Sequence, residues 1–371
     1  MNKKFFFYFP NFNIGGAEKN IINIANEAYL NDFEIKVLVN NDFGLLKKFL
    51  NKNIEIYTLN QNNKLICIIK LIFYILKQKP DYIFSILECS AIAAVVKIFT
   101  KRKTIFINRI CNTISPFLNS QKNKIVYVYQ YILNYLIVLF SDIILVQNNY
   151  MKIDLINVYN LKKINKIHIL NNCLNIDILR KNSSENYNFN FIKKGKKIIF
   201  VTNSSLRPQK NLFEMIKIFK KLSFNYKNIF LIIIGDGKIK LELINFINKL
   251  NLSSSIHITG FETNPHKIVS KCDYYLSTSY FEGTSNSILE ALYFGIPVIS
   301  SNCPSGIEEL INHNNGILVE QTELEENFVI ALEKILSGQI NFATKKKISY
   351  PIEERYNEKK IFKNLIEILN A

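Results

Sequence analysis

The stretch 274-YYLSTSYFEGTSNSILEALYFGIPVIS-300 holds two short apolar runs separated by a loop and a helix-length segment. Its first and last runs, YYLST and PVIS, have the aromatic and β-branched residues that are typical of strands. Between them, Ile288, Leu289 and Leu292 recur at the spacing of an apolar helix face. The stretch therefore predicts a strand, a helix and a second strand, which is the repeating unit of an α/β fold.

The same alternation of apolar runs and helix-length segments continues along the chain. The runs are continuous and not interleaved with polar residues, so both faces of each strand are expected to be covered, as in parallel sheets. The predicted strands begin at 5-FFFYF, 35-IKVLV, 54-IEIYTL, 82-YIFSIL, 104-TIFIN, 142-DIILVQ, 166-KIHIL, 198-IIFVT, 229-IFLIIIG, 256-IHITG, 274-YYLST and 297-PVIS.

A polar segment, 181-KNSSENYNFNFIKKGKK-197, interrupts this alternation before a new strand begins. We interpret it as a linker between two Rossmann-like domains, residues 1–180 and 198–350. A C-terminal helix over 351–371 is expected to return toward the first domain. The 371 residues suffice for two domains with cores of their own.

Charge is concentrated in the first half of the chain. Residues 1–180 carry 23 Lys and Arg against 11 Asp and Glu, while 181–371 carry 24 against 19. The six cysteines form no CxxC pair, which argues against a zinc site or a disulfide framework and indicates a reducing compartment. No RRM, KH or helix-turn-helix signature accompanies the basic composition, so a nucleic-acid partner is not expected.

Two apolar segments raise the question of targeting. The N-terminal run in MNKKFFFYFP ends at a proline without a cleavage-like site, so it predicts a first strand and not a signal peptide. The segment 125-IVYVYQYILNYLIVLF-140 is sixteen residues long, short of the roughly 20 that span a bilayer. It predicts a buried or interfacial helix.

Glycines and a carboxylate follow the first predicted strand, in 14-IGGAEK-19. Gly15 and Gly16 would let the backbone approach a ligand closely, and the helix that follows offers its N-terminus to an anion. A tight strand-to-helix turn with Glu18 in the first helical turn explains the motif equally well.

The first strand of the second domain ends in 202-TNSSLRPQKN-211, which places Arg207 three residues before Lys210. With Pro208 as a first helical residue, the two cations could clamp a diphosphate, although a solvated basic turn is the simpler alternative. Gly235 and Gly237 of 235-GDG-237 predict a sharp turn after the next strand.

Two glutamates stand eight residues apart in the opening stretch. Ser287 and Glu290 fit a capping box, which would make Glu290 structural. Glu282 precedes the helix, beside a loop whose backbone N–H groups could hold an anion: Gly283, Thr284, Ser285 and Asn286.

Together these motifs resemble the GT-B glycosyltransferases of the large retaining family four. Glu282 and Glu290 form its E-x7-E motif, and the other motifs follow in the expected order up to 355-RYNEKKIFKNLIEIL-369. The resemblance implies two Rossmann-like domains with parallel sheets that face each other across a cleft. It implies a nucleotide-sugar donor in the second domain and a glycan acceptor in the first.

The resemblance also assigns roles to residues. Arg207 and Lys210 neutralise the donor diphosphate with the 283–286 loop, Glu290 holds the ribose and Glu282 holds the transferred sugar. Retention through a front-face route is expected, since no carboxylate nucleophile stands out. With no DxD motif near a strand end, neither a metal ion nor a cofactor is implied, and the nucleotide sugar is a substrate.

The first domain departs from the family pattern, because many members have a His near the sugar and none precedes His168 here. In 107-INRICNT-113, Arg109, Asn108 or Asn112 is expected to take this role. His168 is interpreted as a packed core residue. Gly15, Gly16 and Glu18 are assigned to the acceptor or phosphate loop, with Glu18 and Asp236 as weaker candidates for a base.

The acceptor is expected to be a polyprenyl-diphosphate-linked glycan. Lysines among apolar residues in 64-KLICIIKLIFYILKQK-79, with 101-KRK and the 125–140 helix, suit a cytoplasmic protein resting on an anionic inner leaflet. The loop 300-SSNCPSGIEEL-310 resembles bacterial polysaccharide transferases that use UDP-sugars. The alternatives are a soluble transferase with a small-molecule acceptor and a catalytically silent scaffold.

Overall fold

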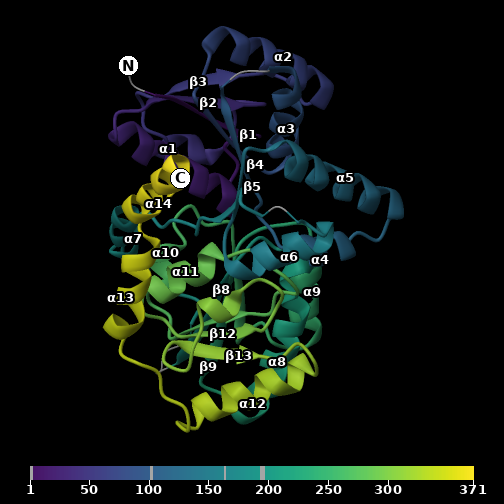
Figure 1. Cartoon of the computed structure of the whole chain (residues 1–371). Coiled ribbons are helices and arrows are strands. Elements are labelled where there is room, and N and C mark those ends of the chain that lie inside the picture. The colour runs from purple at the N-terminus through teal and green to yellow at the C-terminus, as the bar shows by residue number, and fades with distance from the viewer. Residues whose placement is uncertain (1–2, 101–102, 163, 193–196) are drawn as a thin grey trace. The chain divides into compact units, whose positions relative to one another are not determined.

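The computed structural model describes residues 3–100, 103–162, 164–192 and 197–371. The chain divides into two compact units, the first comprising Met1–Leu174 with Tyr356–Ala371 and the second Asn175–Arg355 (Figure 1). Each is a parallel sheet covered by helices, so the predicted class of two Rossmann-like α/β domains is confirmed.

The division lies N-terminal to the polar segment 181–197, of which 193–196 fall outside the described residues. It comes at Leu174 because helix α7 (Ile176–Ser183) already packs within the second unit, against α10 (His266–Val269). Asn175 caps α7 by accepting a hydrogen bond from the backbone N–H of Ile178 at 2.9 Å. The polar composition of residues 181–197 indicated the linker, but the boundary between the units lies at Leu174 because of how α7 packs.

The first unit has a seven-stranded sheet in the order β3-β2-β1-β4-β5-β6-β7. Its strands are β1 (Lys4–Phe9), β2 (Glu34–Val39), β3 (Glu55–Thr58), β4 (Tyr82–Ile86), β5 (Ile105–Arg109), β6 (Ile143–Val146) and β7 (Ile167–Ile169). Its helices are α1 (Gly16–Leu30), α2 (Lys64–Gln78), α3 (Glu88–Thr100), α4 (Ile114–Asn119), α5 (Lys124–Phe140), α6 (Asn149–Tyr159) and α14 (Glu358–Asn370), with a 3-10 turn η1 (Leu45–Phe49).

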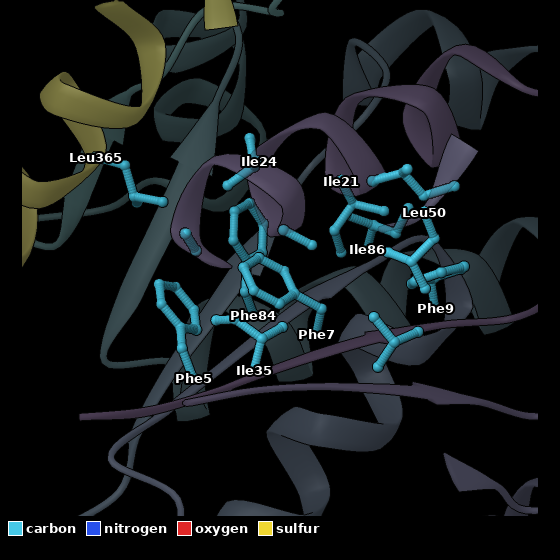
Figure 2. Packing of buried hydrophobic residues seen from close by; sticks show 14 of the residues in the cluster. Phe5, Phe7, Phe9, Ile21, Ile24, Ile35, Leu50, Phe84, Ile86 and Leu365 are labelled. Atoms are coloured by element: carbon cyan, nitrogen blue, oxygen red, sulfur yellow. The ribbon is translucent and has the colours of Figure 1, made fainter. Parts of the chain in front are cut away.

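The central strand β1 shows why its sequence is apolar throughout. Successive side chains of a strand point to opposite faces, and here Phe5 and Phe7 pack beneath α1 and α14, while Phe6 and Tyr8 pack beneath α2 and α3. Figure 2 shows the first of these layers, with Leu365 of α14 reaching the phenylalanines. Residues 358–370 thus complete the core of the first unit.

The second unit has a six-stranded sheet in the order β10-β9-β8-β11-β12-β13. Its strands are β8 (Ile198–Asn203), β9 (Ile229–Ile234), β10 (Ile256–Gly260), β11 (Tyr274–Ser277), β12 (Val298–Ser301) and β13 (Gly316–Val319). Its other helices are α8 (Leu212–Asn225), α9 (Lys240–Lys249), α11 (Asn286–Tyr293), α12 (Leu324–Leu336) and α13 (Lys345–Tyr356), with 3-10 turns η2 (Pro208–Lys210) and η3 (Ile307–Glu309).

The position of the strands directs attention to one place in this unit. The order of the sheet reverses between β8 and β11, because β9 and β10 continue on one side of β8 and β11 to β13 on the other. Ligands of open parallel sheets bind beyond the carboxyl ends of the strands at such a reversal. Strand β13, a four-residue edge strand, was not among the predicted strands.

Candidate functional site

A small hollow lies at the carboxyl ends of β8 and β11. Its lining includes Lys210, Glu282 and several hydroxyl side chains, Thr202, Ser204, Tyr275, Thr278 and Ser285. The hollow is a shallow recess that opens to solvent. The polar side chains at these strand ends are thus partly accessible from outside the second unit.

Hydrogen bonds hold the turn η2 against the loop that follows β11. The backbone N–H of Tyr280 donates to the Gln209 carbonyl at 3.0 Å, and the Gln209 amide donates to the Phe281 carbonyl at 2.8 Å. The Thr278 hydroxyl donates to the Lys210 carbonyl at 3.1 Å. These contacts bring Lys210 and Glu282, which are 72 residues apart in sequence, to the same point.

Lys210 and Glu282 form an ion pair at the hollow. The Lys210 ammonium donates to Glu282 Oε1, and the Ser279 hydroxyl donates to the same oxygen at 2.7 Å. Only 19% of the Lys210 side chain and 13% of the Glu282 side chain are exposed. Burial acts to lower the pKa of Lys210, but the Glu282 carboxylate outweighs it and raises the pKa above its ordinary value. Lys210 is therefore charged at neutral pH.

Glu290 lies on the buried face of α11 and faces His266. Glu290 Oε2 is 3.3 Å from His266 Nε2. The two atoms are close, but their geometry does not meet the criteria for a hydrogen bond. The Asn182 amide nitrogen lies 3.1 Å from His266 Nδ1, and because that nitrogen can only donate, Nδ1 accepts and Nε2 of a neutral ring carries the proton toward Glu290.

This arrangement corrects one interpretation and adds one residue. The capping box of Ser287 and Glu290 is wrong, because α11 begins at Asn286 with Ser285 as its N-cap. His266 was missed: it is buried, but it stands 24 residues before Glu290 in a short helix, and nothing in the spacing relates the two.

The hollow includes only some of the other residues predicted for the second domain. Ser285 lines it, at the start of α11, and Gly283 is buried in the preceding loop. Arg207 is exposed and is not among the side chains that line the hollow in the described part of the chain. Thr284 and Asn286 flank Ser285 and are half-buried.

Gly235 and Gly237 lie against the backbone of the 204–206 segment. Gly235 has φ of +141°, and a Cβ there would stand 1.9 Å from the Ser204 carbonyl oxygen. A Cβ on Gly237 would stand 2.3 Å from the Leu206 carbonyl oxygen. Both positions therefore require glycine for close backbone packing. Asp236, between them, is exposed and pairs with Lys240 at 2.7 Å.

In the first unit, the 14–19 motif lies at the start of α1, next to the carboxyl end of β1. Gly15 is the N-cap, Gly16 begins the helix and Glu18 stands in its first turn. The Gly15 backbone is extended, with φ of −149°, so no left-handed conformation demands glycine there. The geometry leaves both explanations of the motif in place.

Arg109 ends β5 and is buried. One of its terminal nitrogens, Nη2, donates to the Leu170 carbonyl at 3.0 Å and to the Asn172 side-chain oxygen at 2.8 Å. Nη1 has no hydrogen-bond partner within the described ranges, and burial lowers the pKa of the guanidinium. Asn108 is buried and engaged with Ser85 and Ser141, while Asn112 is half-buried in the next loop.

His168 lies in β7, where burial lowers its pKa. It was expected to be a packed core residue, but it is only half-buried because β7 is an edge strand of the sheet. Within residues 3–100, 103–162, 164–192 and 197–371, no three His, Cys, Asp or Glu side chains gather as metal ligands would. No helix in these ranges is long and apolar enough to cross a bilayer.

Comparison with known proteins relates the second unit to a family of glycosyltransferases. Residues 183–355, which contain the hollow, match the family described as glycosyl transferases group 1. An uncharacterized glycosyltransferase of Methanocaldococcus jannaschii is 31% identical over 252 residues, 65% of this chain and 60% of that protein.

A second relative, from Campylobacter jejuni, is the N-acetylgalactosamine-N,N'-diacetylbacillosaminyl-diphospho-undecaprenol 4-alpha-N-acetylgalactosaminyltransferase. It is 28% identical over 248 residues, 67% of this chain and 62% of that protein. The matched region thus spans less than two thirds of either relative.

Among solved structures, Anabaena HepE in complex with UDP and glucose superposes with a TM-score of 0.80. It is 20% identical and covers 100% of both chains. Likeness at this level of identity concerns the fold, and this chain has the two-domain fold of such GT-B structures.

Proposed function

We propose that this chain, whose residues 183–355 match the group 1 glycosyl transferases, transfers a hexose or an N-acetylhexosamine from a UDP-sugar to a glycan acceptor with retention of configuration. The observation that supports this most is the buried Lys210–Glu282 pair at the reversal of the second sheet. In this pair a cation that can bind phosphate is held next to a carboxylate that can accept hydrogen bonds from sugar hydroxyls.

In this proposal Lys210 binds the donor diphosphate. An ammonium has three N–H donors, so Lys210 can keep Glu282 while donating to phosphate oxygens. Charge accumulates on the diphosphate as the glycosidic bond breaks, and a cation held in place at that point lowers the barrier. Arg207, exposed three residues earlier, is the second cation, and the N-terminus of α11 with Gly283 to Asn286 adds N–H donors.

Glu282 and Glu290 position the donor. Glu282 Oε1 accepts from Lys210 and Ser279, which fixes the carboxylate in place, and Glu282 is assigned to hydroxyls of the transferred sugar. Glu290 is assigned to the ribose hydroxyls, oriented by His266. Gly235 and Gly237 shape the loop beside Ser204 and Leu206 that completes the donor side.

We further propose that the reaction follows a front-face route without a metal ion. Glu282, paired with Lys210, is poorly suited to attack the anomeric carbon, because a nucleophile in that pair must give up its ion partner. The leaving diphosphate takes the acceptor proton while the sugar passes through an oxocarbenium-like state. Lys210 then contributes chiefly by stabilising the leaving group.

The acceptor side is assigned to the first unit, with Gly15, Gly16, Glu18 and Arg109 around the start of α1 and the end of β5. The Campylobacter relative carries a diphospho-undecaprenol-linked glycan in its name, and we infer the same class of lipid-linked acceptor here. Such an acceptor lies in a membrane, which agrees with the excess of positive charge in residues 1–180. The protein is then a peripheral one at the inner face of the cell membrane.

The test is a panel of UDP-, GDP- and ADP-sugars screened by thermal shift, because a ligand of the folded state raises its apparent stability. A UDP-sugar should stabilise the intact chain and Lys217→Met, whose lysine is exposed on α8, but not Lys210→Met. If no nucleotide sugar binds the intact chain, the proposal fails. Binding without sugar transfer to any lipid-linked or soluble acceptor would indicate a silent scaffold instead.

The stereochemistry needs its own measurement. The anomeric configuration of the new glycosidic bond, determined by NMR on the isolated product, should match that of the donor sugar. An inverted product would overturn the front-face route and leave the donor site intact.

A further inference from the structure

Helix α5 has an apolar stripe that faces solvent. Ile125 is 79% exposed, and Val128, Ile132, Tyr135 and Leu139 follow it at helical spacing, each at least 39% exposed. A surface helix normally turns polar residues outward. The stripe therefore marks a surface that something covers.

From Tyr131 onward, α5 packs within the first unit, against α6 and α3. Ile137 packs against Ala91 and Ala94 of α3, with Leu133 and Phe140 beside it. All six residues from Lys124 to Tyr129 are exposed, whichever side of the helix they occupy. Figure 1 shows this end of α5 extending outward beyond α3.

Helix α2 carries a second stripe of the same kind. Its buried side includes Cys67 and Leu71, yet Leu65, Ile69 and Phe73 are 70%, 53% and 69% exposed on the opposite side. These three positions are four residues apart, so they lie along one line of the helix. The helix is apolar on its packed side and on its outer side.

The two stripes begin next to each other. The Lys64 ammonium at the start of α2 donates to the Tyr129 hydroxyl at 2.6 Å and lies 5.0 Å from the centre of its ring. Leu65 and Val128 directly adjoin these two residues in sequence. We name the combined surface the α2–α5 face and define it by Leu65, Ile69, Phe73, Ile125, Val128 and Ile132.

The positive charge around the α2–α5 face indicates which kind of partner binds there. Residues 59–140 contain eleven Lys and Arg against two Asp and Glu, and neither α2 nor α5 contains an acidic residue. Of the eleven, 101 and 102 lie outside the described residues; Lys64, Lys70, Lys77, Lys122 and Lys124 are exposed. Two copies of such a surface repel each other, whereas an anionic bilayer attracts it.

We propose that the α2–α5 face enters the outer part of an anionic bilayer, with its apolar stripes among the acyl chains and its lysines at the headgroups. Tyr127 and Tyr129 have the apolar ring and polar tip that suit the boundary between these layers. At 17 residues, α5 is about 26 Å long, and a helix of this composition lies in the interface. The inference rests on the proposed lipid-linked acceptor for its purpose, but its test does not.

The chain contains no tryptophan, so one introduced indole reports on one position. Ile132→Trp tests the face, and Leu241→Trp, at a 75% exposed position on α9 of the second unit, is the matched control. With vesicles of phosphatidylcholine and phosphatidylglycerol carrying brominated acyl chains, fluorescence of the first variant should be quenched and that of the control should not. Vesicles without phosphatidylglycerol should quench much less.

Loss of the face is tested by flotation. Ile125→Ser, Val128→Ser and Ile132→Ser combined should lower vesicle binding by at least about tenfold, because three apolar side chains no longer enter the acyl layer. The same triple variant should keep the thermal shift with a UDP-sugar, which shows that it folds and separates this result from the donor proposal.

Two outcomes would overturn the inference. One is equal quenching of both indoles, or of neither. The other is that the intact chain does not bind vesicles but forms a concentration-dependent dimer, and the triple variant does not form this dimer. The α2–α5 face would then be an interface with a second copy of the chain.

Discussion

Lys210 contributes its charge to the hollow as half of a pair with Glu282. Replacing it by methionine keeps most of the unbranched side chain but removes the cation from a carboxylate side chain that is only 13% exposed. We expect Lys210→Met to lower the transfer rate by about 10²–10³ and the unfolding free energy by about 1–3 kcal/mol. Steady-state kinetics and urea denaturation measure the two effects.

The control is Lys217→Met on α8, where the lysine is exposed and pairs with Glu214 at 3.2 Å. It should change stability by less than about 0.5 kcal/mol and leave the rate alone. Equal rates for the two variants would show that Lys210 does not face the leaving group.

The raised pKa of Lys210 gives the stability effect a pH dependence. A lysine whose pKa is higher in the folded state stabilises that state fully below its unfolded pKa, about 10.4, and loses this contribution as pH rises through the folded value. The stability gap between the intact chain and Lys210→Met should therefore be constant at neutral pH and shrink only in strong alkali. Denaturation series at several pH values provide the check, and a gap that narrows between pH 6 and 8 would contradict it.

His266 is expected to act as a positioning residue for Glu290. His266→Gln keeps an N–H donor near Glu290 Oε2, whereas His266→Leu leaves the carboxylate buried beside an apolar group. The leucine variant should raise the donor KM by roughly tenfold, about 1.4 kcal/mol, with less effect on kcat, because the buried Glu290 carboxylate loses the polar ring that faces it. Recovery by glutamine distinguishes positioning from packing; if both variants behave alike, His266 is structural.

Among single residues, the sequence predicted site residues that directly follow strands, but not those that tertiary packing brings to the site. Lys210 and Glu282 were recognisable because each lies just beyond a predicted strand, where ligands of parallel sheets bind. His266 could not be found this way, since its relation to Glu290 depends on how α10 packs near α11. The capping box failed because Ser285, two residues earlier, takes the N-cap.

Among the elements, the 235–237 turn packs against the backbone of Ser204, which lines the hollow. Gly235→Ala would force a Cβ to within 1.9 Å of the Ser204 carbonyl at a φ of +141°. We expect a loss of about 3 kcal/mol or more in unfolding free energy, from strain and clash together. Gly338→Ala is the matched control, because its φ is +77° with nothing within 4 Å, and it should cost only about 1 kcal/mol. Calorimetric unfolding of both variants compares them directly.

Most elements could be predicted because their apolar runs are long. The strands β1 to β12 coincide with predicted runs, since covered strands must be apolar on both faces. Strand β13 is only Gly316–Val319, and the signal of four residues between turns is too weak to separate from a loop. The exposure of α5 was also beyond the sequence, which shows an apolar segment and not what surrounds it.

At the scale of the whole molecule, α14 is remote in sequence from the unit that it stabilises. Leu365 is fully buried in the core of the first unit, and Phe362 meets Phe33 edge to face at 6.0 Å between ring centres. Leu365→Ala should therefore destabilise the first unit by about 2–5 kcal/mol, while Lys363→Ala on the exposed side of α14 should not.

Denaturation with and without a UDP-sugar separates the two units, because the ligand is expected to protect the second unit only. In the leucine variant the ligand-independent transition should move to lower denaturant. If the ligand-sensitive transition moves instead, α14 supports the second unit.

The return of α14 to the first unit also sets an order of events during synthesis. A ribosome must translate all of Asn175–Arg355 before Glu358–Asn370 emerges, so the second unit has its complete sequence while the first still lacks one helix. Domains are usually expected to fold from the N-terminus onward as they emerge. In this chain the apolar surface of the first unit that α14 covers stays exposed until the second unit has been translated. Chaperones that bind exposed apolar surfaces can therefore bind the nascent first unit throughout that time.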